Sequence, residues 1–170
     1  SVDTREELIA VLERVLDELH DPHAHLTANT SGSPRLVPSG ADIWAEWRDG
    51  RAIVEEVRDD SDAERSGIRA GADILALNDV PIAEAVKSRI GRSIRTVDDR
   101  VRSWALRAVL AGHHNQPRRI RLQMNGSAST VTLPGPDQFV TRNVPLTSRM
   151  LPDDIGYIRF HDSLGDQGVI

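Results

Sequence analysis

Residues 61–82 decide the fold of this chain, and their sequence is SDAERSGIRAGADILALNDVPI. Ser61, followed three residues later by Glu64, is the capping box that begins a helix, because each side chain accepts a hydrogen bond from a backbone N–H that the first turn leaves unpaired. Gly67 ends the helix, since glycine readily adopts the left-handed conformation that follows a last helical turn. The apolar run 74–77 is typical of a buried strand. The segment therefore predicts a short capped helix and then a core strand.

Two hairpin turns are predicted, one before this segment and one after it. Asp-Gly at 49–50 and Asn-Gly at 125–126 are favoured two-residue turns, because both positions accept positive φ. Apolar and polar residues alternate beside each turn, which is the period of a half-buried strand. In chain order we expect strands at 43–48 and 51–57, a helix at 61–66, a strand at 73–77, a spacer over 83–97, a helix at 98–110, and strands at 120–124 and 130–133.

The sequence before residue 30 is expected to form a helical segment. Asp3 and Glu6 resemble a capping box, and Pro22 ends the helix because proline cannot continue one. Six apolar residues have the spacing of one helix face, which we expect to be buried: Leu8, Val11, Leu12, Val15, Leu16 and Leu19. The whole pattern predicts an α+β fold, a small and partly open β-barrel with two helices, preceded by an N-terminal helical segment.

Composition excludes several classes of protein. The chain has 170 residues, of which 39% are hydrophobic and 28% charged, with a net charge of −5 and no cysteine. It is long enough to bury a core, and it has no apolar run of the ~20 residues that span a membrane. The lack of cysteine excludes a disulfide scaffold, and the acidic balance argues against nucleic acid as the main partner, because phosphate binding needs a basic face. No phosphate-binding loop and no His-Glu-x-x-His zinc motif occurs, and no cofactor is expected.

The segment 52–82 resembles a bacterial PDZ domain. The shared pattern is a strand, a helix capped by Ser-x-Ala, the sequence Gly-Ile-x-x-Gly at 67–71, a buried strand, and Asn-x-x-Pro at 78–81. Two positions depart from the pattern: Ala72 precedes the expected aspartate, and Asp79 stands where the family usually has glycine. The resemblance implies a PDZ-like fold with slightly altered turns.

The regions around this unit resemble the tail-specific (S41) serine peptidases, which include C-terminal processing peptidases and tricorn-type proteases. Residues 18–26, ELHDPHAHL, are similar to the family's Leu-x-Asp-x-His motif, and residues 155–160, IGYIRF, to the strand that opens its catalytic domain. The order implies an N-terminal helical segment at 1–30 and a PDZ-like domain at 31–137. It implies that 138–170 is a connector with the first strand of a catalytic domain truncated before its nucleophile.

This resemblance implies part of a hydrolase. The parent is expected to be a bacterial serine endopeptidase that cleaves proteins or peptides near their C-termini, and this fragment is expected to be inactive alone. The expected partners are a peptide or protein C-terminus, the missing catalytic domain and a second copy in a homo-oligomer. A periplasmic or secreted location is implied, and a cytoplasmic one stays open. The alternative is a non-enzymatic PDZ-like peptide-binding adaptor.

The PDZ-like unit is expected either to bind peptide or to gate the active site of the parent. PDZ domains add a peptide strand to a sheet edge beside a helix, and a loop of backbone N–H groups holds the terminal carboxylate of the peptide. By position, this loop consists of Ser39, Gly40, Ala41, Asp42 and Ile43. We expect the Asp42 carboxylate to repel that of the peptide by on the order of 1 kcal/mol.

Three histidines within 18–26, His20, His23 and His25, form the candidate reactive site. Imidazoles together with Asp21 suit zinc, so a metal-binding module is a second alternative. The resemblance implies another role, because His23 stands where tricorn-type members have the general base, and neutral imidazole suits that task. The third interpretation is structural, a buried imidazole bonded to backbone.

The remaining aromatic and basic residues are assigned to packing and to the surface. Trp44, Trp47 and Trp104 are expected in the core or in a groove wall, because no basic stripe accompanies them as it does in a nucleic-acid stacking surface. The basic run 118–121 is expected to face solvent.

Overall fold

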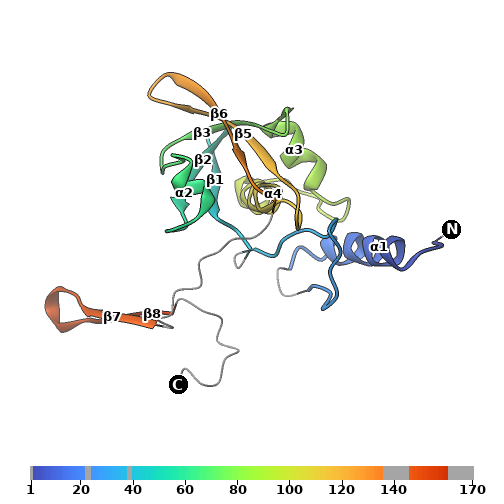
Figure 1. Cartoon of the computed structure of the whole chain (residues 1–170), viewed down its shortest axis with the longest axis horizontal. Coiled ribbons are helices and arrows are strands. Elements are labelled where there is room, and N and C mark those ends of the chain that lie inside the picture. The colour runs from blue at the N-terminus through green and yellow to red at the C-terminus, as the bar shows by residue number, and fades with distance from the viewer. Residues whose placement is uncertain (1, 22–23, 38–39, 136–145, 161–170) are drawn as a thin grey trace. The chain divides into compact units, whose positions relative to one another are not determined.

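The computed structural model describes residues 2–21, 24–37, 40–135 and 146–160 (Figure 1). The chain forms two compact units, Ser1–Gln138 and Phe139–Ile170. The first unit contains α1 (Arg5–Asp17), β1 (Ile43–Arg48), β2 (Arg51–Val57), α2 (Asp62–Arg65), β3 (Asp73–Leu77), β4 (Val80–Pro81), α3 (Ile82–Arg89), α4 (Asp99–Ala111), β5 (Arg118–Met124) and β6 (Ser127–Leu133). The second contains β7 (Leu146–Met150), a 3₁₀ turn (Pro152–Asp154) and β8 (Gly156–Phe160).

The sheet of the first unit is antiparallel and open. Its strands lie in the order β1-β2-β3-β5-β6, and the short β4 pairs with β3. Within the described residues, β1 and β6 are the two edges, each with one neighbouring strand (Figure 1). The prediction of an α+β fold is confirmed, and the sheet remains open instead of closing into a barrel.

The capped helix and the strand that follows it fold as their sequence predicts. The Ser61 hydroxyl accepts a hydrogen bond from the Glu64 N–H at 3.2 Å, and α2 ends before Gly67, whose φ is +87°. In β3, Ile74 and Leu77 are buried in the core. The local signals in this segment therefore agree with the fold that forms around it.

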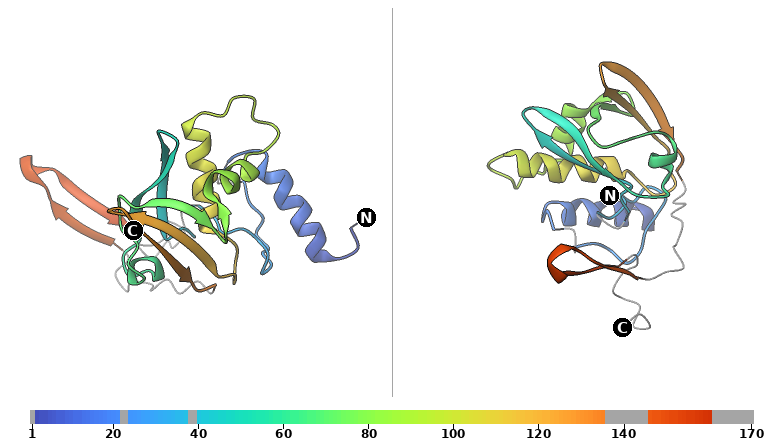
Figure 2. Two further views of the ribbon diagram at one scale, coloured as in Figure 1. Left: turned by 90° about the horizontal axis from the view of Figure 1, so that it is seen from above. Right: turned by 90° about the vertical axis from the view of Figure 1, so that its left-hand side faces the viewer.

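The hydrophobic core joins the sheet to α3 and α4. α4 packs along β1, α3 packs on β3 and on α4, and Figure 2 shows both helices next to the sheet. The core residues include Ile43, Val54, Ile74, Ile120, Leu122 and Leu133 from the sheet, and Ile82, Val86, Leu106 and Leu110 from the helices. This packing holds α4 beside the edge strand β1.

Both predicted hairpin turns are confirmed. Asp49 and Gly50 have φ of 50° and 76°, and Asn125 and Gly126 have φ of 51° and 81°. Positive φ at both central positions matches the twist of the flanking strands. The register pairs the two residues that flank each turn, as a two-residue hairpin requires.

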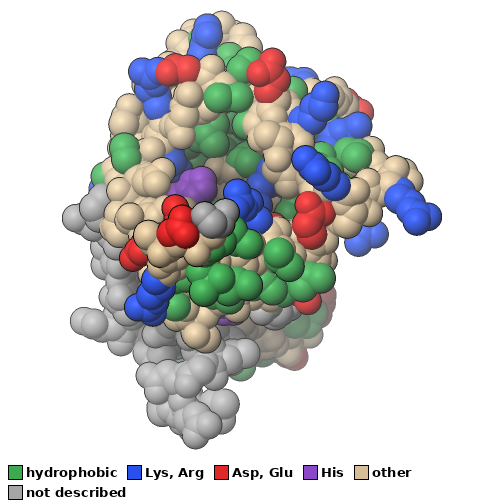
Figure 3. Space-filling view, turned by 90° about the vertical axis from the view of Figure 1, so that its right-hand side faces the viewer, with side chains coloured by type: hydrophobic (Ala, Val, Ile, Leu, Met, Phe, Trp, Pro, Cys, Tyr) green, Lys and Arg blue, Asp and Glu red, His purple; other side chains and the backbone are tan. Residues whose placement is uncertain are grey.

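The prediction that the apolar stripe of α1 is buried is wrong. The helix begins at the N-cap Thr4, which forms the capping box with Glu7, and Ile9 is its buried residue. Four residues of the predicted stripe are 41–62% exposed: Leu8, Leu12, Val15 and Leu19. Figure 3, viewed from the side on which α1 lies, shows hydrophobic side chains gathered on this surface.

Polar contacts at the end of α1 explain why the stripe is not buried. Asp17 forms an ion pair with Arg89 of α3, and the Glu18 carboxylate accepts hydrogen bonds from the backbone N–H groups of Arg92 and Ser93 at 3.2 and 3.0 Å. These contacts fix the C-terminal end of the helix to the segment after α3. The amphipathic pattern predicts the helix correctly, but it does not predict which face meets the rest of the unit.

The predicted spacer at 83–97 is also wrong, because α3 occupies its first half. Ile82, Ala85 and Val86 are buried at the spacing of one helix face. Eight residues hold only two helical turns, and so short an apolar pattern gives a weak signal in the sequence. Residues 31–135 therefore contain the three helices α2, α3 and α4, where two were expected.

The second unit is a hairpin of β7 and β8. The two strands pair antiparallel from Leu146↔Phe160 to Met150↔Gly156, and β8 matches the strand expected at 155–160. Among the described residues, no helix combines the length and the apolar composition needed to cross a membrane.

Candidate functional site

The edge strand β1 offers backbone hydrogen-bonding groups on the side away from β2. In a two-residue hairpin, Arg48 and Arg51 exchange hydrogen bonds, so alternate residues of β1 turn their backbone groups toward β2 or away from it. Ile43, Ala45 and Trp47 are the residues whose N–H and C=O groups point outward. Helix α4 runs beside this outward edge.

Near the C-terminal end of β1, a side chain of α4 already accepts a hydrogen bond from one of these backbone groups. The Trp47 N–H donates to the Ser103 Oγ at 2.8 Å, and the two residues are 9% and 7% exposed. A strand added to this edge would lie ~4.8 Å from β1. The Ser103 side chain already occupies that space beside Trp47. For Ile43 and Ala45, the described part of the chain contains no hydrogen bond outside the sheet, and both residues are buried.

Near the N-terminal end of β1, α4 contacts a side chain of the strand and not its backbone. The Arg107 guanidinium lies over the Trp44 ring, 4.3 Å from its centroid. Partial burial lowers the pKa of Arg107 from its ordinary value. This cation–π contact joins helix and strand through their side chains. The expectation that Trp44 and Trp47 form core or groove wall is consistent with this arrangement.

The loop before β1 is closely packed. The Gly40 N–H donates to the Leu36 C=O at 2.7 Å, and a Cβ at Gly40 would lie 2.8 Å from that oxygen, so a side chain does not fit there. The Ala41 C=O accepts a hydrogen bond from the Arg58 Nε at 3.0 Å. Ser39, the first residue of the predicted loop, lies outside the described residues. The assignment of residues 39–43 to carboxylate binding stays a prediction.

Asp42 and Arg118 form a buried ion pair. The Asp42 carboxylate accepts two hydrogen bonds from the Arg118 guanidinium, at 2.8 and 2.7 Å, and each side chain is 4% exposed. Arg118 also donates to the Leu110 C=O at the end of α4 at 2.6 Å. The expectation that the basic run faces solvent is therefore wrong for Arg118. The guanidinium neutralises the charge for which Asp42 was expected to repel a peptide carboxylate.

The histidine segment lies against the middle of α4. The His20 ring meets Trp104 edge to face, with 4.6 Å between the centroids, and its buried Nε2 has no hydrogen-bond partner among the described residues. His25 is exposed, and His23 lies outside the described residues. Within the described ranges no three His, Asp or Glu side chains converge as metal ligands. The role of His23 stays a prediction.

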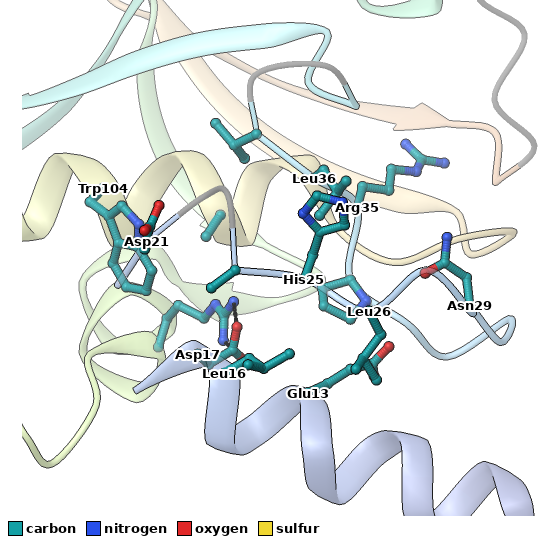
Figure 4. Close-up of a pocket in the computed structure, with 15 residues that line it drawn as sticks. Glu13, Leu16, Asp17, Asp21, His25, Leu26, Asn29, Arg35, Leu36 and Trp104 are labelled. Atoms are coloured by element: carbon teal, nitrogen blue, oxygen red, sulfur yellow. Dashed lines mark hydrogen bonds and ion pairs between the residues drawn. The ribbon is translucent and has the colours of Figure 1, made fainter. Parts of the chain in front are cut away.

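A small cavity of about 80 Å³ lies between this segment, α1 and α4 (Figure 4). The Asp17–Arg89 ion pair lines one side, and Trp104, Asp21 and His25 also line it. The cavity has room for a few water-sized groups. Its lining includes charged side chains of both signs.

No protein-family model and no curated protein matches this chain. Several solved structures are similar to this chain. Mature CPAF is 19% identical with a TM-score of 0.44, over 55% of this chain and 18% of that one. Mature CPAF complexed with lactacystin is 17% identical with a TM-score of 0.48, over 73% and 24%. The photosystem II D1 C-terminal processing protease is 18% identical with a TM-score of 0.45, over 94% and 43%. The chain spans less than half the length of each of these three.

Proposed function

We propose that this chain is the non-catalytic, PDZ-like part of an S41-type serine endopeptidase, and that its first unit binds the C-terminal residues of proteins or peptides. The observation that carries the proposal is the edge of β1. Ile43 and Ala45 direct backbone groups away from β2, directly after the tight loop at 40–42. They are 1% and 0% exposed beside α4, so a peptide strand can enter only when the helix moves away. The sequence resemblance of 52–82 to PDZ domains supports the same assignment.

Binding would proceed by strand addition. A peptide that runs antiparallel to β1 exchanges main-chain hydrogen bonds with Ala45, which gives affinity without a requirement for one sequence. Its carboxylate then reaches the loop before Ile43, where the backbone N–H groups of Ala41 and Asp42 are the candidate donors. Because Arg118 compensates the charge of Asp42, the loop presents no net negative charge to the peptide.

Catalysis is proposed for the parent protein only. By the resemblance, the nucleophile follows the region equivalent to 155–160, and the chain supplies substrate binding or control of access. The boundaries at residues 30 and 137, the periplasmic or secreted location and the association of copies remain part of this proposal.

A titration of the full chain with the hexapeptide Ser-Ala-Thr-Val-Ala-Val tests the function. We expect binding of the peptide with a free carboxylate, and at least tenfold weaker binding of its C-terminal amide, because the amide carries no charge for the loop. Ala45→Pro removes the outward N–H and should weaken binding at least tenfold. Proline is tolerated at a sheet edge when the lost N–H was not part of the ladder.

The matched control is Ala128→Pro, which places proline at an outward-facing residue of the opposite edge strand, β6. It should bind the peptide like the unmodified chain, and thermal melts should show that both variants fold. Equal binding of acid and amide, or equal loss in both variants, would contradict strand addition at β1.

A further inference from the structure

The β1 edge is buried beside α4 at all three residues that face away from β2. Ile43 and Ala45 are 1% and 0% exposed, and Trp47, at 9%, donates its N–H to the Ser103 Oγ at 2.8 Å. The Ser103 side chain stands in the space, ~4.8 Å from β1, that an added strand would occupy. A peptide can therefore bind only to a form of the unit in which α4 has moved outward.

The closed form leaves buried backbone groups unpaired. The N–H and C=O of Ala45 point away from β2, and within the described ranges they make no hydrogen bond outside the sheet. Burial of an unpaired backbone group costs free energy comparable to a lost hydrogen bond, and an added strand would remove this cost. The closed form must therefore be stabilised by contacts elsewhere on α4.

The end of the N-terminal helix lies behind α4. Both views of Figure 2 show α4 between β1 and α1. The contact is made at Trp104, the neighbour of Ser103. The His20 ring meets Trp104 edge to face with 4.6 Å between the centroids, and the Arg89 guanidinium lies 5.5 Å from its ring centroid. Arg89 is paired with Asp17 of α1, so this ring is held from two sides.

The space behind α4 is unequal along the helix. Beside the C-terminal half, a groove of about 560 Å³ lies between α1, α3 and α4, with Val109 in its lining. Beside Trp104 the cavity is about 80 Å³, which is too small to receive a displaced helical turn. The part of α4 that carries Ser103 therefore cannot leave β1 unless the end of α1 yields.

Building on the proposed function, we infer that α4 is an autoinhibitory lid over β1, and that the N-terminal segment at 5–20 holds this lid closed through Trp104. The measured affinity for a peptide is then the affinity of the open form multiplied by the fraction of molecules that is open. Contacts made only in the closed form lower that fraction. Loosening the N-terminal segment should therefore tighten peptide binding.

Two measurements on the full chain test the inference together: calorimetric titration with Ser-Ala-Thr-Val-Ala-Val, and amide hydrogen exchange of the free chain followed by NMR. Asp17→Asn breaks the ion pair with Arg89 and changes no residue of α4 or β1, and it should tighten peptide binding at least threefold. Exchange of the Trp47 N–H requires the same opening, so it should accelerate by the same factor. The Ile120 N–H in the central strand β5 reports global unfolding and separates lid opening from a general loss of stability.

A second variant loosens the lid from the side of the strand. In Ser103→Ala the Trp47 N–H has a partner only when a peptide is bound, so this variant should also bind the hexapeptide more tightly. The matched control is Asp79→Asn, which breaks an ion pair with Arg119 that involves neither α4 nor β1. It should leave peptide affinity and Trp47 exchange unchanged, and thermal melts should show that all three variants fold.

The outcomes separate the inference from the function on which it rests. If the unmodified chain binds the peptide, and Asp17→Asn binds it equally or more weakly or leaves Trp47 exchange unchanged, the N-terminal segment does not hold the lid. The inference is then wrong and the proposed function stands. If the unmodified chain, Asp17→Asn and Ser103→Ala all fail to bind the peptide, whatever the exchange shows, the proposed function is wrong and the inference falls with it.

Discussion

Arg118 forms a buried ion pair that links two elements of the first unit. Its guanidinium joins the loop before β1 to the end of α4, by two hydrogen bonds to Asp42 and one to the Leu110 carbonyl. Both charges are taken out of water, so each depends on the other for its solvation. Removal of one partner leaves the other charge buried and unpaired.

We therefore predict that Arg118→Met destabilises the first unit by ~3–5 kcal/mol, measured by urea unfolding. Replacing both partners, as in Asp42→Leu with Arg118→Met, should recover a large part of the loss, because no uncompensated charge remains. A single variant that unfolds like the unmodified chain would contradict the buried pair.

Glu18 links the N-terminal segment to the turn after α3, and the link depends on pH. Hydrogen bonds from the backbone N–H groups of Ser93 and Arg92 lower the pKa of Glu18 from its ordinary value of 4.5. The unfolded chain thus binds this proton more readily than the folded one, so the contribution to stability is present above pH 4.5 and is lost as the pH falls through the lowered pKa.

Glu18→Gln should accordingly be less stable than the unmodified chain at neutral pH, and the difference should shrink as the pH falls below 4.5. Denaturant titrations across this range measure it, with the exposed Glu56→Gln as the control. A difference that stays constant with pH would show that the carboxylate charge is not what holds the turn.

At the scale of elements, the end of α2 depends on one glycine. Gly67 has φ of +87°, and a Cβ there would meet no atom within 4 Å. Any effect of a side chain therefore comes from backbone strain alone, without a steric clash. The hydrogen bond from the Ile68 N–H to the Ala63 C=O at 3.1 Å closes the helix behind it.

Gly67→Val should destabilise the unit by more than ~1 kcal/mol, because a β-branched residue is strained at positive φ. Gly67→Asn should cost less, since asparagine tolerates this conformation. Thermal unfolding of the two variants distinguishes them, and a valine variant that melts like the unmodified chain would place the helix end elsewhere.

Sequence predicts the elements best where short-range signals agree. The Ser61 cap, Gly67 and the Asp-Gly and Asn-Gly turns act within four residues, and the structure has them as expected, whereas the capping box of α1 is Thr4 with Glu7 and not Asp3 with Glu6. Contacts between residues far apart in the sequence are not predicted by such local signals. The expected burial of the α1 stripe fails because polar contacts to Arg89 and Ser93, more than seventy residues away, fix the helix end.

At the scale of the whole molecule, the candidate site depends on the distance between β1 and α4. The sequence predicts a role for the loop 39–43, but not for Ser103 or Arg107. Ser103 is 56 residues from Trp47, and a serine within a helix has no local signal for this role. The pairing exists only because the core packs α4 along the sheet edge.

Amide hydrogen exchange of Ala45, followed by NMR in the full chain, tests strand addition at β1 most directly. Saturation with the hexapeptide that carries a free carboxylate should slow exchange of the Ala45 N–H at least tenfold, because the peptide carbonyl accepts it. The Ala128 N–H on the opposite edge should exchange at its original rate. Peptide binding that leaves Ala45 exchange unchanged would contradict the account.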